Sequence, residues 1–363
     1  MFQTLSFIKR VNWLLFAPVF LLLSFGVFGV LSATFGDHGF TYFFKQLIFL
    51  AFSLLAFLAV RSVNWRFFKN EGKTLFLGYL LSLGLLAGLF VLGSEIRGAV
   101  SWYRFGSLGF EPVEFAKIIL VLVLAKYFSL RHVEIFQIRH IIVSFLYAGV
   151  PILLVLLQPD LGSAMILGGI WFSMVLFAGI KFKHLAAVIF LALVFLVFAW
   201  HFVLFDYQKD RITSFLDPER DPHGSSYNLM QSLISVGSGG MMGKGFGRGS
   251  QTQLGFLPES YSDFIFASLS EELGFFGSSL ILILYFLLLF AMIRAGQKTE
   301  DNFSRLTIFG FAAMFLVEIV INIGMNIGLL PITGTPLPFL SYGGSNLLLS
   351  FVSLGIIASL VKK

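Results

Sequence analysis

The sequence predicts an all-α polytopic membrane protein with about ten transmembrane helices. Of its 363 residues, 57% are hydrophobic and 17% aromatic, and only 12% are charged, whereas a soluble domain has about 25% charged residues. Ten apolar runs follow one another along the chain, and most approach the roughly 20 residues that a helix needs to cross a hydrocarbon core of about 30 Å. This composition excludes a water-soluble globular enzyme.

The predicted transmembrane helices follow these apolar runs in chain order. They cover residues 12–33, 46–61, 74–94, 113–130, 141–157, 161–180, 185–205, 264–293, 306–330 and 345–361. The first run has no small-residue cleavage site and is too long for a signal-peptide core, so we expect a retained anchor. The pattern contains no repeat of solenoid length, and we interpret residues 1–363 as one membrane-embedded domain.

The distribution of basic residues orients these helices. Ten spans put both termini on one side, and that side receives sixteen of the 25 basic residues: Lys9, Arg10, Arg61, Arg66, Lys69, Lys73, Lys126, Arg131, Arg139, Lys181, Lys183, Arg294, Lys298, Arg305, Lys362 and Lys363. Because Lys and Arg accumulate on the cytoplasmic face, both termini should be cytoplasmic. The same bias explains the net charge of +6 without nucleic-acid binding.

One large extracytoplasmic loop, residues 206–264, lies between the seventh and eighth helices. Loops of this length in compact proteins are usually functional or disordered. Ser225 and Ser226 precede an apolar pattern at Leu229, Met230, Leu233, Ile234 and Val236. This pattern predicts a short capped amphipathic helix that lies on the membrane surface.

Charged side chains inside the predicted helices are candidates for function, because burying a charge in the bilayer is costly. Glu114 and Lys117 are three residues apart and share a helical face. They could form a self-neutralising ion pair, or Lys117 could hold an anionic substrate group that Glu114 orients. Glu318, Asn322 and Asn326 recur every four residues and form a polar stripe, for which hydrogen bonding between helices is the favoured role.

Residues 237–250, the glycine loop, contain seven glycines together with Lys244 and Arg248. The Walker pattern is excluded, because Ser238 and Gly245 stand where it needs Gly and Ser or Thr. The loop could cradle a phosphate through its backbone N–H groups, or it could be only a flexible turn.

Two carboxylates stand where loops become helices. Asp263 precedes the eighth predicted helix and Asp160 the sixth, so each could be a helix cap or a functional group. Residues 331–344, the hinge segment, carry three prolines and three glycines at membrane depth. Such backbone requires a protein-walled or watery cavity there.

Six motifs together closely resemble the SEDS family (shape, elongation, division and sporulation). They are Glu-Pro-Val-Glu-Phe-Ala-Lys at 111–117, Gln-Pro-Asp-Leu-Gly at 158–162, the glycine-rich run from Gln231 to Gly245, Phe-Leu-Pro-Glu with Asp-Phe-Ile-Phe-Ala at 256–267, Glu-Glu-Leu-Gly-Phe at 271–275 and Pro-Leu-Pro-Phe-Leu-Ser-Tyr-Gly-Gly-Ser at 336–345. The glycine-rich run and the Gly-Ser-Gln-Thr-Gln-Leu stretch resemble the elongation branch, RodA, more than the division branch, FtsW.

The resemblance implies an inverting peptidoglycan glycosyltransferase that polymerises lipid II, an undecaprenyl-pyrophosphate-linked disaccharide peptide. It implies a class B penicillin-binding protein as partner and a bacterial inner membrane location with the active site facing outward. It makes Asp263 the candidate catalytic base and links Glu114, Lys117 and Asp160 to activity. Lys117, Lys244, Arg248 or a divalent cation, Mg or Mn, could neutralise the pyrophosphate, and Glu259 could raise the basicity of Asp263.

The sequence departs from the family pattern at two places. The usual Gln-Pro-Ser-Glu is Glu111-Pro112-Val113-Glu114 here, and Ser101 occupies the position of an arginine that normally precedes Trp102. Arg104, three residues later, could replace that arginine.

Two other classes of function fit some of these features. A lipid II flippase or transporter also needs charged groups within a helical bundle. A non-catalytic scaffold for wall synthesis is the third alternative.

Overall fold

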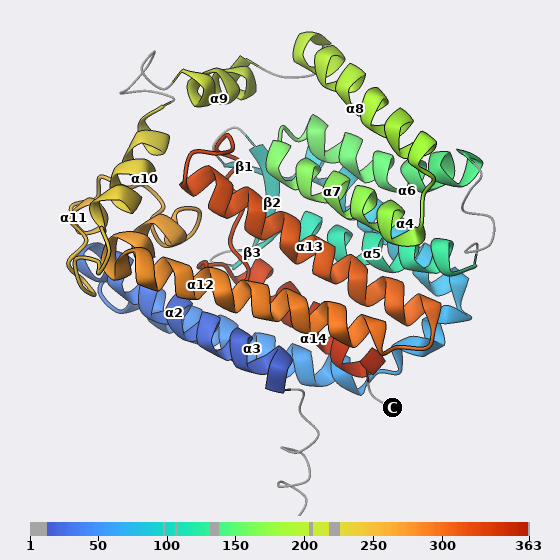
Figure 1. The fold of residues 1–363 in the computed structure, drawn as a ribbon, viewed down its shortest axis with the longest axis horizontal. Coiled ribbons are helices and arrows are strands. Elements are labelled where there is room, and N and C mark those ends of the chain that lie inside the picture. The colour runs from blue at the N-terminus through green and yellow to red at the C-terminus, as the bar shows by residue number, and fades with distance from the viewer. Residues whose placement is uncertain are drawn as a thin grey trace, which may run out of the picture.

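The computed structural model describes residues 13–96, 99–105, 108–130, 138–202, 206–217 and 226–361. The long helices are α2 (Trp13–His38), α3 (Thr41–Ser62), α4 (Gly72–Leu92), α5 (Pro112–Leu130), α6 (Ile138–Leu157), α7 (Leu161–Ala178), α8 (Phe182–Phe202), α12 (Ile265–Gln297), α13 (Asn302–Asn326) and α14 (Gly344–Val361). The shorter ones are η1 (Trp65–Lys69), α9 (Asp206–Leu216), α10 (Tyr227–Ser238) and α11 (Ser250–Gln253). Figure 1 shows the long helices gathered in a bundle.

Each of the ten predicted apolar runs is a helix in the structure. Nine of the described helices are long and apolar enough to cross a membrane. The tenth, α5, has 19 residues and three charged side chains, Glu114, Lys117 and Lys126. These three charges distinguish the composition of α5 from that of the other nine helices. Most of its residues are nevertheless buried in the bundle.

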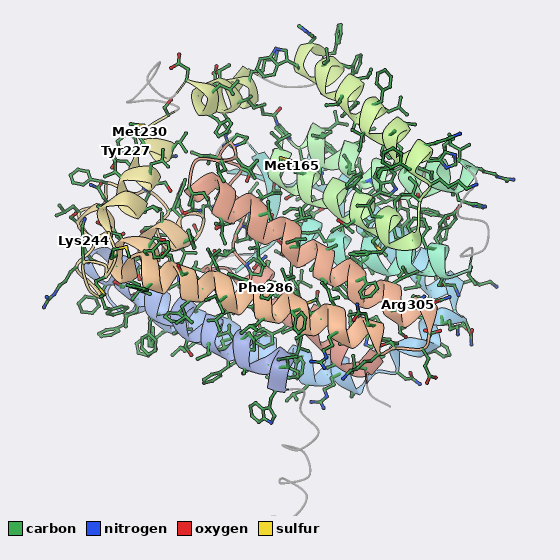
Figure 2. All side chains as sticks on the ribbon, viewed as in Figure 1. Met165, Tyr227, Met230, Lys244, Phe286 and Arg305 are labelled. Carbon is green, nitrogen blue, oxygen red and sulfur yellow. The ribbon has the colours of Figure 1, made fainter. Side chains whose placement is uncertain are left out.

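The cytoplasmic and outer ends predicted from charge correspond to opposite ends of the bundle. Figure 2 shows Arg305 at one end and Tyr227, Met230 and Lys244 at the other. The basic residues Lys9, Arg10, Arg131, Lys362 and Lys363, which contribute to the predicted orientation, lie outside the described residues.

Helix α13 is the central element of the bundle. It packs on α7, α12 and α5, and it is the most buried of the candidate membrane helices. Helix α8 is the opposite extreme: it is apolar on all sides, mostly exposed, and stands apart from the bundle in Figure 1. An all-round apolar surface suits contact with lipid.

A small antiparallel sheet follows α4, in the order β1 (Ser94–Ile96), β2 (Ala99–Phe105), β3 (Leu108–Phe110). The sequence does not reveal these strands, because β1 and β3 have three residues each and β2, Ala-Val-Ser-Trp-Tyr-Arg-Phe, has no regular two-residue alternation. The Tyr103 hydroxyl donates to the Leu85 carbonyl of α4 (2.8 Å), and Val100 N–H donates to the Gln158 carbonyl (3.3 Å). The sheet is thereby fixed to α4 and to the turn before α7.

The predicted amphipathic helix is α10, but two details of the prediction are wrong. Ser226 occupies the N-cap position without a side-chain cap hydrogen bond, and Ser225 lies outside the described residues. The buried face consists of Leu229 and two serines, and Leu233 and Ile234 are exposed. The helix turns its small residues inward because it packs closely on α12.

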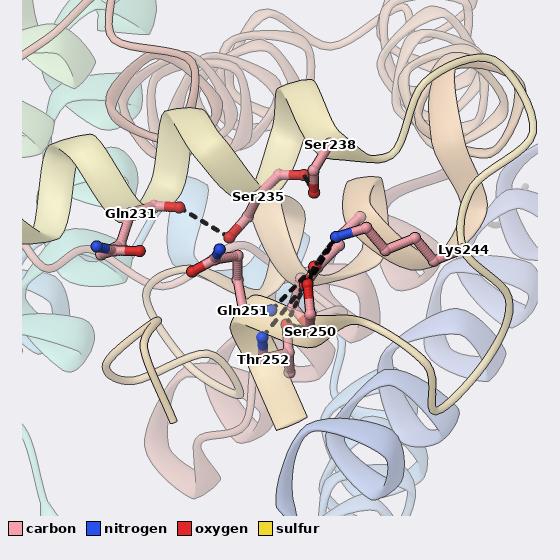
Figure 3. A network of polar contacts seen from close by, with 9 residues as sticks. Gln231, Ser235, Ser238, Lys244, Ser250, Gln251 and Thr252 are labelled. Atoms are coloured by element: carbon pink, nitrogen blue, oxygen red, sulfur yellow. Dashed lines mark hydrogen bonds and ion pairs between the residues drawn. The ribbon is translucent and has the colours of Figure 1, made fainter. Parts of the chain in front are cut away.

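The glycine loop wraps around α12 at Glu271, whose side chain is fully buried. The Glu271 carboxylate accepts hydrogen bonds from Lys244 Nζ (2.7 Å), Gln251 N–H (3.0 Å) and both the N–H (3.2 Å) and hydroxyl (3.1 Å) of Thr252. Figure 3 shows Lys244, Ser250, Gln251 and Thr252 around this network. A buried carboxylate requires such donors, because leaving it unpaired is costly.

The backbone of the glycine loop also lies against α12. Lys244 N–H and Gly245 N–H each donate to a carbonyl of α12 at 3.0 Å, and α12 is interrupted at Gly274, where φ is 67° and ψ is −164°. A Cβ on Gly243 would lie 2.1 Å from the Glu272 carbonyl oxygen. The glycines are therefore required for close packing, and the loop is a structural clasp on α12 and not a flexible turn.

We expect Gly243→Ala to destabilise the protein by about 1–3 kcal/mol, because the residue combines a positive φ with a backbone clash. Thermal unfolding in detergent measures the effect. Gly237→Ala is the matched control, since a Cβ at this helical glycine meets nothing within 4 Å. Equal melting temperatures for the two variants would contradict the clasp.

Candidate active site

Three segments meet at one end of the bundle: the start of α7, the junction before α12 and the hinge segment. A Cβ on Gly162 would lie 2.6 Å from Thr335 Cγ2, so α7 begins directly against the hinge segment. A Cβ on Gly334 would lie 3.5 Å from Asp263 Oδ2. Asp160, at the start of α7, and Asp263 therefore approach the same stretch of backbone.

Asp263 is held by the polar stripe of α13. Its carbonyl accepts hydrogen bonds from Asn322 Nδ2 (3.0 Å) and Asn326 Nδ2 (3.1 Å), and Asn326 Oδ1 accepts from Ala267 N–H (3.0 Å). Asn322 Nδ2 also donates to the Thr335 carbonyl (2.7 Å) of the hinge segment. The predicted interhelical role of the stripe is confirmed, and its partners are the backbone groups that position Asp263.

The alternative prediction that Asp263 caps the eighth predicted helix is wrong. Helix α12 begins at Ile265, and its N-cap is Phe264, which makes no side-chain cap hydrogen bond. The Asp263 side chain is thus one residue outside the cap position.

The second half of the hinge segment, residues 337–341, is buried by protein, whereas Gly334 is exposed. Ser341 Oγ donates to the Ser262 carbonyl (2.7 Å) and accepts from Leu337 N–H (2.8 Å). Tyr342 N–H donates to the Tyr261 carbonyl (2.9 Å), and the Tyr285 hydroxyl donates to the Pro338 carbonyl (2.6 Å). These bonds replace those of a regular helix and join the hinge segment to the loop that carries Asp263.

Glu114 and Lys117 form the predicted ion pair, and Glu318 is its third member. Lys117 Nζ lies 2.7 Å from Glu114 Oε1 and 2.6 Å from Glu318 Oε1. All three side chains are buried, and Asn346 Nδ2 of α14 donates to Glu114 Oε1 (3.5 Å). The ion triad joins α5, α13 and α14 and places two carboxylates on one ammonium.

Asp160 is the N-cap of α7, as the structural alternative predicted. Its Oδ1 accepts from Ser163 N–H (3.0 Å), and its Oδ2 accepts from the Ser101 hydroxyl of β2 (3.4 Å). Ser101, at the position where the family pattern has arginine, thus connects the sheet to Asp160.

Trp102 and Arg104 lie on the opposite face of β2 from Ser101, because side chains alternate along a strand. The Trp102 ring covers Gly109 of β3, and Arg104 is exposed. Arg104 therefore does not occupy the place that an arginine at position 101 would take beside Asp160.

The remaining sequence candidates lie in the outer loop. Lys244 is engaged by Glu271, which favours a structural role for it, and Arg248 is exposed on the same glycine loop. Glu259 Oε2 accepts from the Ser262 hydroxyl (3.0 Å). Among the described residues, no group of three or more His, Cys, Asp or Glu could hold a metal ion.

Two residues of α9 reach the site and were missed from the sequence. Gln208 Nε2 donates to the Pro159 carbonyl (3.3 Å), and Arg211 Nη1 approaches the Ile332 carbonyl (3.5 Å). Arg211, Ser214, Leu229 and Ile332 line a small cavity. Arg211 thus brings a guanidinium to the hinge segment, two residues from Gly334. The only sequence signal was its place in the long outer loop.

Glu111 was also missed as a site residue. Burial raises its pKa well above the ordinary value, and the negative charges of Glu114, Asp160 and Asp263 raise it further, against an opposing effect of Lys117. The sequence feature that could have identified Glu111 is its departure from the family pattern, which has Gln at this position.

A family model described as "Cell cycle protein", for the FtsW, RodA and SpoVE proteins, matches residues 8–363. The chain belongs to this family. The resemblance to the SEDS family drawn from the motifs is therefore confirmed. The FtsW/RodA/SpoVE family match covers nearly the whole chain, including every residue discussed above.

Named relatives and solved structures agree with this membership. The chain is 36% identical over 282 residues to the peptidoglycan glycosyltransferase MrdB of Escherichia coli K12, covering 78% of this chain and 76% of MrdB. It is 36% identical over 349 residues to the stage V sporulation protein E of Bacillus subtilis, covering 93% of each.

Two solved structures share its fold. A chain from a structure of a peptidoglycan synthase complex, described as coordinating polymerization and crosslinking, has a TM-score of 0.83 at 30% identity and covers 96% of this chain and 97% of its own length. The rod shape determining protein RodA of Thermus thermophilus has a TM-score of 0.71 at 28% identity, covering 96% and 95%.

We expect Lys117→Met to lower the free energy of unfolding by about 3–5 kcal/mol, because it leaves two buried carboxylates without their cation. Glu318→Gln should lower the free energy of unfolding much less, because it leaves Lys117 paired with Glu114. The melting temperatures of the two variants in detergent measure this difference.

Lys69→Met is the control for this comparison. It removes an ion pair of similar length, 2.6 Å to Asp301, in which the lysine is 52% exposed, and such surface pairs contribute about 0–1 kcal/mol. If Lys117→Met is no less stable than Glu318→Gln, the two buried carboxylates do not depend on Lys117 for their stability.

Proposed function

We propose that this protein is a peptidoglycan glycosyltransferase that polymerises lipid II into glycan strands during cell-wall elongation and maintenance of cell shape. Membership in a family whose relatives are named peptidoglycan glycosyltransferases supports the reaction class. The observation that carries the proposal is the position of Asp263, whose backbone is held by Asn322 and Asn326 while its carboxylate lies beside the hinge segment.

Asp263 acts as the general base in this proposal. It takes the proton from the acceptor sugar hydroxyl as that oxygen attacks the anomeric carbon of the donor. The bond from this carbon to the pyrophosphate breaks, and the lipid pyrophosphate leaves with the electron pair. Attack opposite the leaving group inverts the anomeric configuration.

The leaving pyrophosphate needs positive charge. Arg211 suits this role because it reaches Ile332 of the hinge segment, two residues from Gly334, which lies beside the Asp263 carboxylate. Lys117 can contribute to the positive electrostatic potential at the site, although it already forms ion pairs with two carboxylates. Lys244 suits the role less, since Glu271 holds it on α12. Asp160 supports the site by capping α7, and Glu114 supports it by holding Lys117.

The flippase alternative is less well supported. Asp263, Asp160, Arg211 and the hinge segment meet at one end of the bundle, and a carrier needs a site that opens to both sides. A scaffold would not need the hydrogen bonds that position Asp263.

We infer that the active site faces outward from a bacterial inner membrane, with both termini in the cytoplasm, because the basic residues gather at the opposite end. A class B penicillin-binding protein is the proposed crosslinking partner. The likeness to a chain of a peptidoglycan synthase complex supports this pairing.

Asp263→Asn should reduce polymerisation by about 100-fold or more, the usual contribution of a general base, while the protein folds normally. Asn keeps the size of the side chain, and the hydrogen bonds from Asn322 and Asn326 reach the backbone carbonyl, which the substitution leaves in place. The measurement is glycan polymer formed from lipid II in detergent, where no bilayer exists to be crossed.

Asp301→Asn is a matched control. Asp301 caps α13, with its carboxylate accepting from Ser304 N–H (2.9 Å), and Asn caps a helix about as well as Asp. Polymer formation by Asp263→Asn at the rate of this control would remove the general base from the proposal. Absence of polymer from the unsubstituted protein would favour the flippase or the scaffold.

A further inference from the structure

The glycine loop presents an apolar edge, made of Met241, Met242 and Phe246, on the surface of the protein. Met242 is 79% exposed and Phe246 is 51% exposed, and Met241 is exposed as well. Phe275 and Phe276 of α12 are also exposed, and Phe276 N–H donates to the Met241 carbonyl (3.3 Å). The apolar edge therefore continues directly into the exposed face of a candidate membrane helix. Contiguous exposed apolar surface of this kind marks contact with a membrane or with another protein.

Helix α2 shows how deep the apolar edge lies. The Phe246 ring packs edge-on against the exposed ring of Phe28, with the ring centroids 6.4 Å apart. The part of α2 that is apolar enough to cross a membrane is Trp13–Gly36, with 24 residues, or about 36 Å of helix, and Phe28 lies about 12 Å from its Gly36 end. A hydrocarbon core is about 30 Å thick, so Phe28 would lie among the acyl chains even if the whole excess of about 6 Å projected from this end. Phe246, in contact with Phe28, lies at the same depth.

The backbone of the glycine loop is suited to this depth. Irregular backbone among acyl chains needs its hydrogen-bond partners from the protein, because lipid chains offer none. Lys244 N–H and Gly245 N–H donate to carbonyls of α12 (3.0 Å each), and Arg248 N–H donates to the Gly245 carbonyl (3.1 Å). Gly247 N–H donates to the Ser32 hydroxyl of α2 (3.1 Å). A loop in water would not need these partners, so their presence favours a lipid environment.

The two cations of the glycine loop are also compatible with lipid. Lys244 is paired with Glu271 of α12, at 2.7 Å, so its charge is neutralised within the protein. Arg248 is exposed and follows Phe246 by two residues. An arginine side chain is long enough to carry its guanidinium from the acyl chains to the headgroup phosphates. The loop thus combines an apolar edge with a cation that can bind lipid phosphate.

We propose that the glycine loop is inserted into one leaflet of the bilayer, with its apolar edge among the acyl chains and Arg248 at the lipid phosphates. The leaflet is the one at the end of the bundle where Figure 2 shows Lys244. The insertion itself does not depend on the reaction that the protein catalyses. Only the identification of this leaflet as the outer one rests on the proposed function and orientation.

Labelling at single cysteines tests the insertion, and the chain has no cysteine that would interfere. Met242→Cys and Phe246→Cys, each labelled with the fluorophore NBD, are reconstituted in nanodiscs of phosphatidylcholine and phosphatidylglycerol. Lipids with a nitroxide on the acyl chain quench labels in the bilayer, and iodide quenches labels in water. Phe20→Cys, at an exposed residue of α2, is the lipid reference, and Glu300→Cys, in the exposed turn between α12 and α13, is the water reference.

Both labelled loop variants should behave like labelled Phe20→Cys. Their emission should shift to the blue relative to Glu300→Cys, and quenching by iodide should be lost. Nitroxides near the headgroup end of the acyl chain should quench them more than nitroxides near the methyl end, because the loop enters the leaflet from its surface. Met242→Cys should keep the melting temperature of the unsubstituted protein in detergent, because the Met242 side chain is mostly exposed.

Two results would overturn the proposal. Iodide quenching as strong as that of Glu300→Cys would place the glycine loop in water. Protection from both iodide and the nitroxide lipids would mean that protein, either a second copy of this chain or a partner, covers the apolar edge. None of these measurements requires polymerisation of lipid II, so a failure of the proposed function would leave them interpretable.

Discussion

The free-energy cost of burying polar groups in an apolar bundle governs the arrangement of this protein. The polar stripe of α13 offsets this cost by giving buried polar groups their partners. Glu318 binds Lys117, and Asn322 and Asn326 bind the carbonyl of Asp263. Each of these groups would be expensive to bury alone. Since all three lie on one face of one helix, the ion triad and the position of Asp263 depend on the same element.

The hinge segment illustrates the same constraint for the backbone. Its prolines prevent a helix, so its N–H and C=O groups need partners from other elements. Tyr285 of α12 and Asn322 of α13 donate to its carbonyls, and Ser341 within the segment donates to the Ser262 carbonyl next to Asp263. Irregular backbone in this bundle is therefore both a requirement of the site and the means by which distant segments are joined.

The sequence was sufficient to predict the ten long helices, because a run of about 20 apolar residues has few other uses. It also predicted the Glu114–Lys117 pair, which depends only on local spacing. It could not predict Glu318 as a third member or Arg211 as a neighbour of the hinge segment, because these contacts join residues far apart in the chain. The glycine loop was ambiguous for a related reason: its glycines fit the surface of α12, which no local pattern reveals.

Helix α13 also has a second face, and it determines what the surroundings can do to the site. Leu316 and Val320, the residues two positions before and two positions after Glu318, are exposed on it. From Glu318 to Asn326 is about 12 Å along a helix, a fixed length. A membrane helix adjusts its tilt to the thickness of the bilayer, and a tilt of α13 would displace both ends of this rigid spacer together. A change in bilayer thickness would therefore alter the geometry of the site through the tilt of α13.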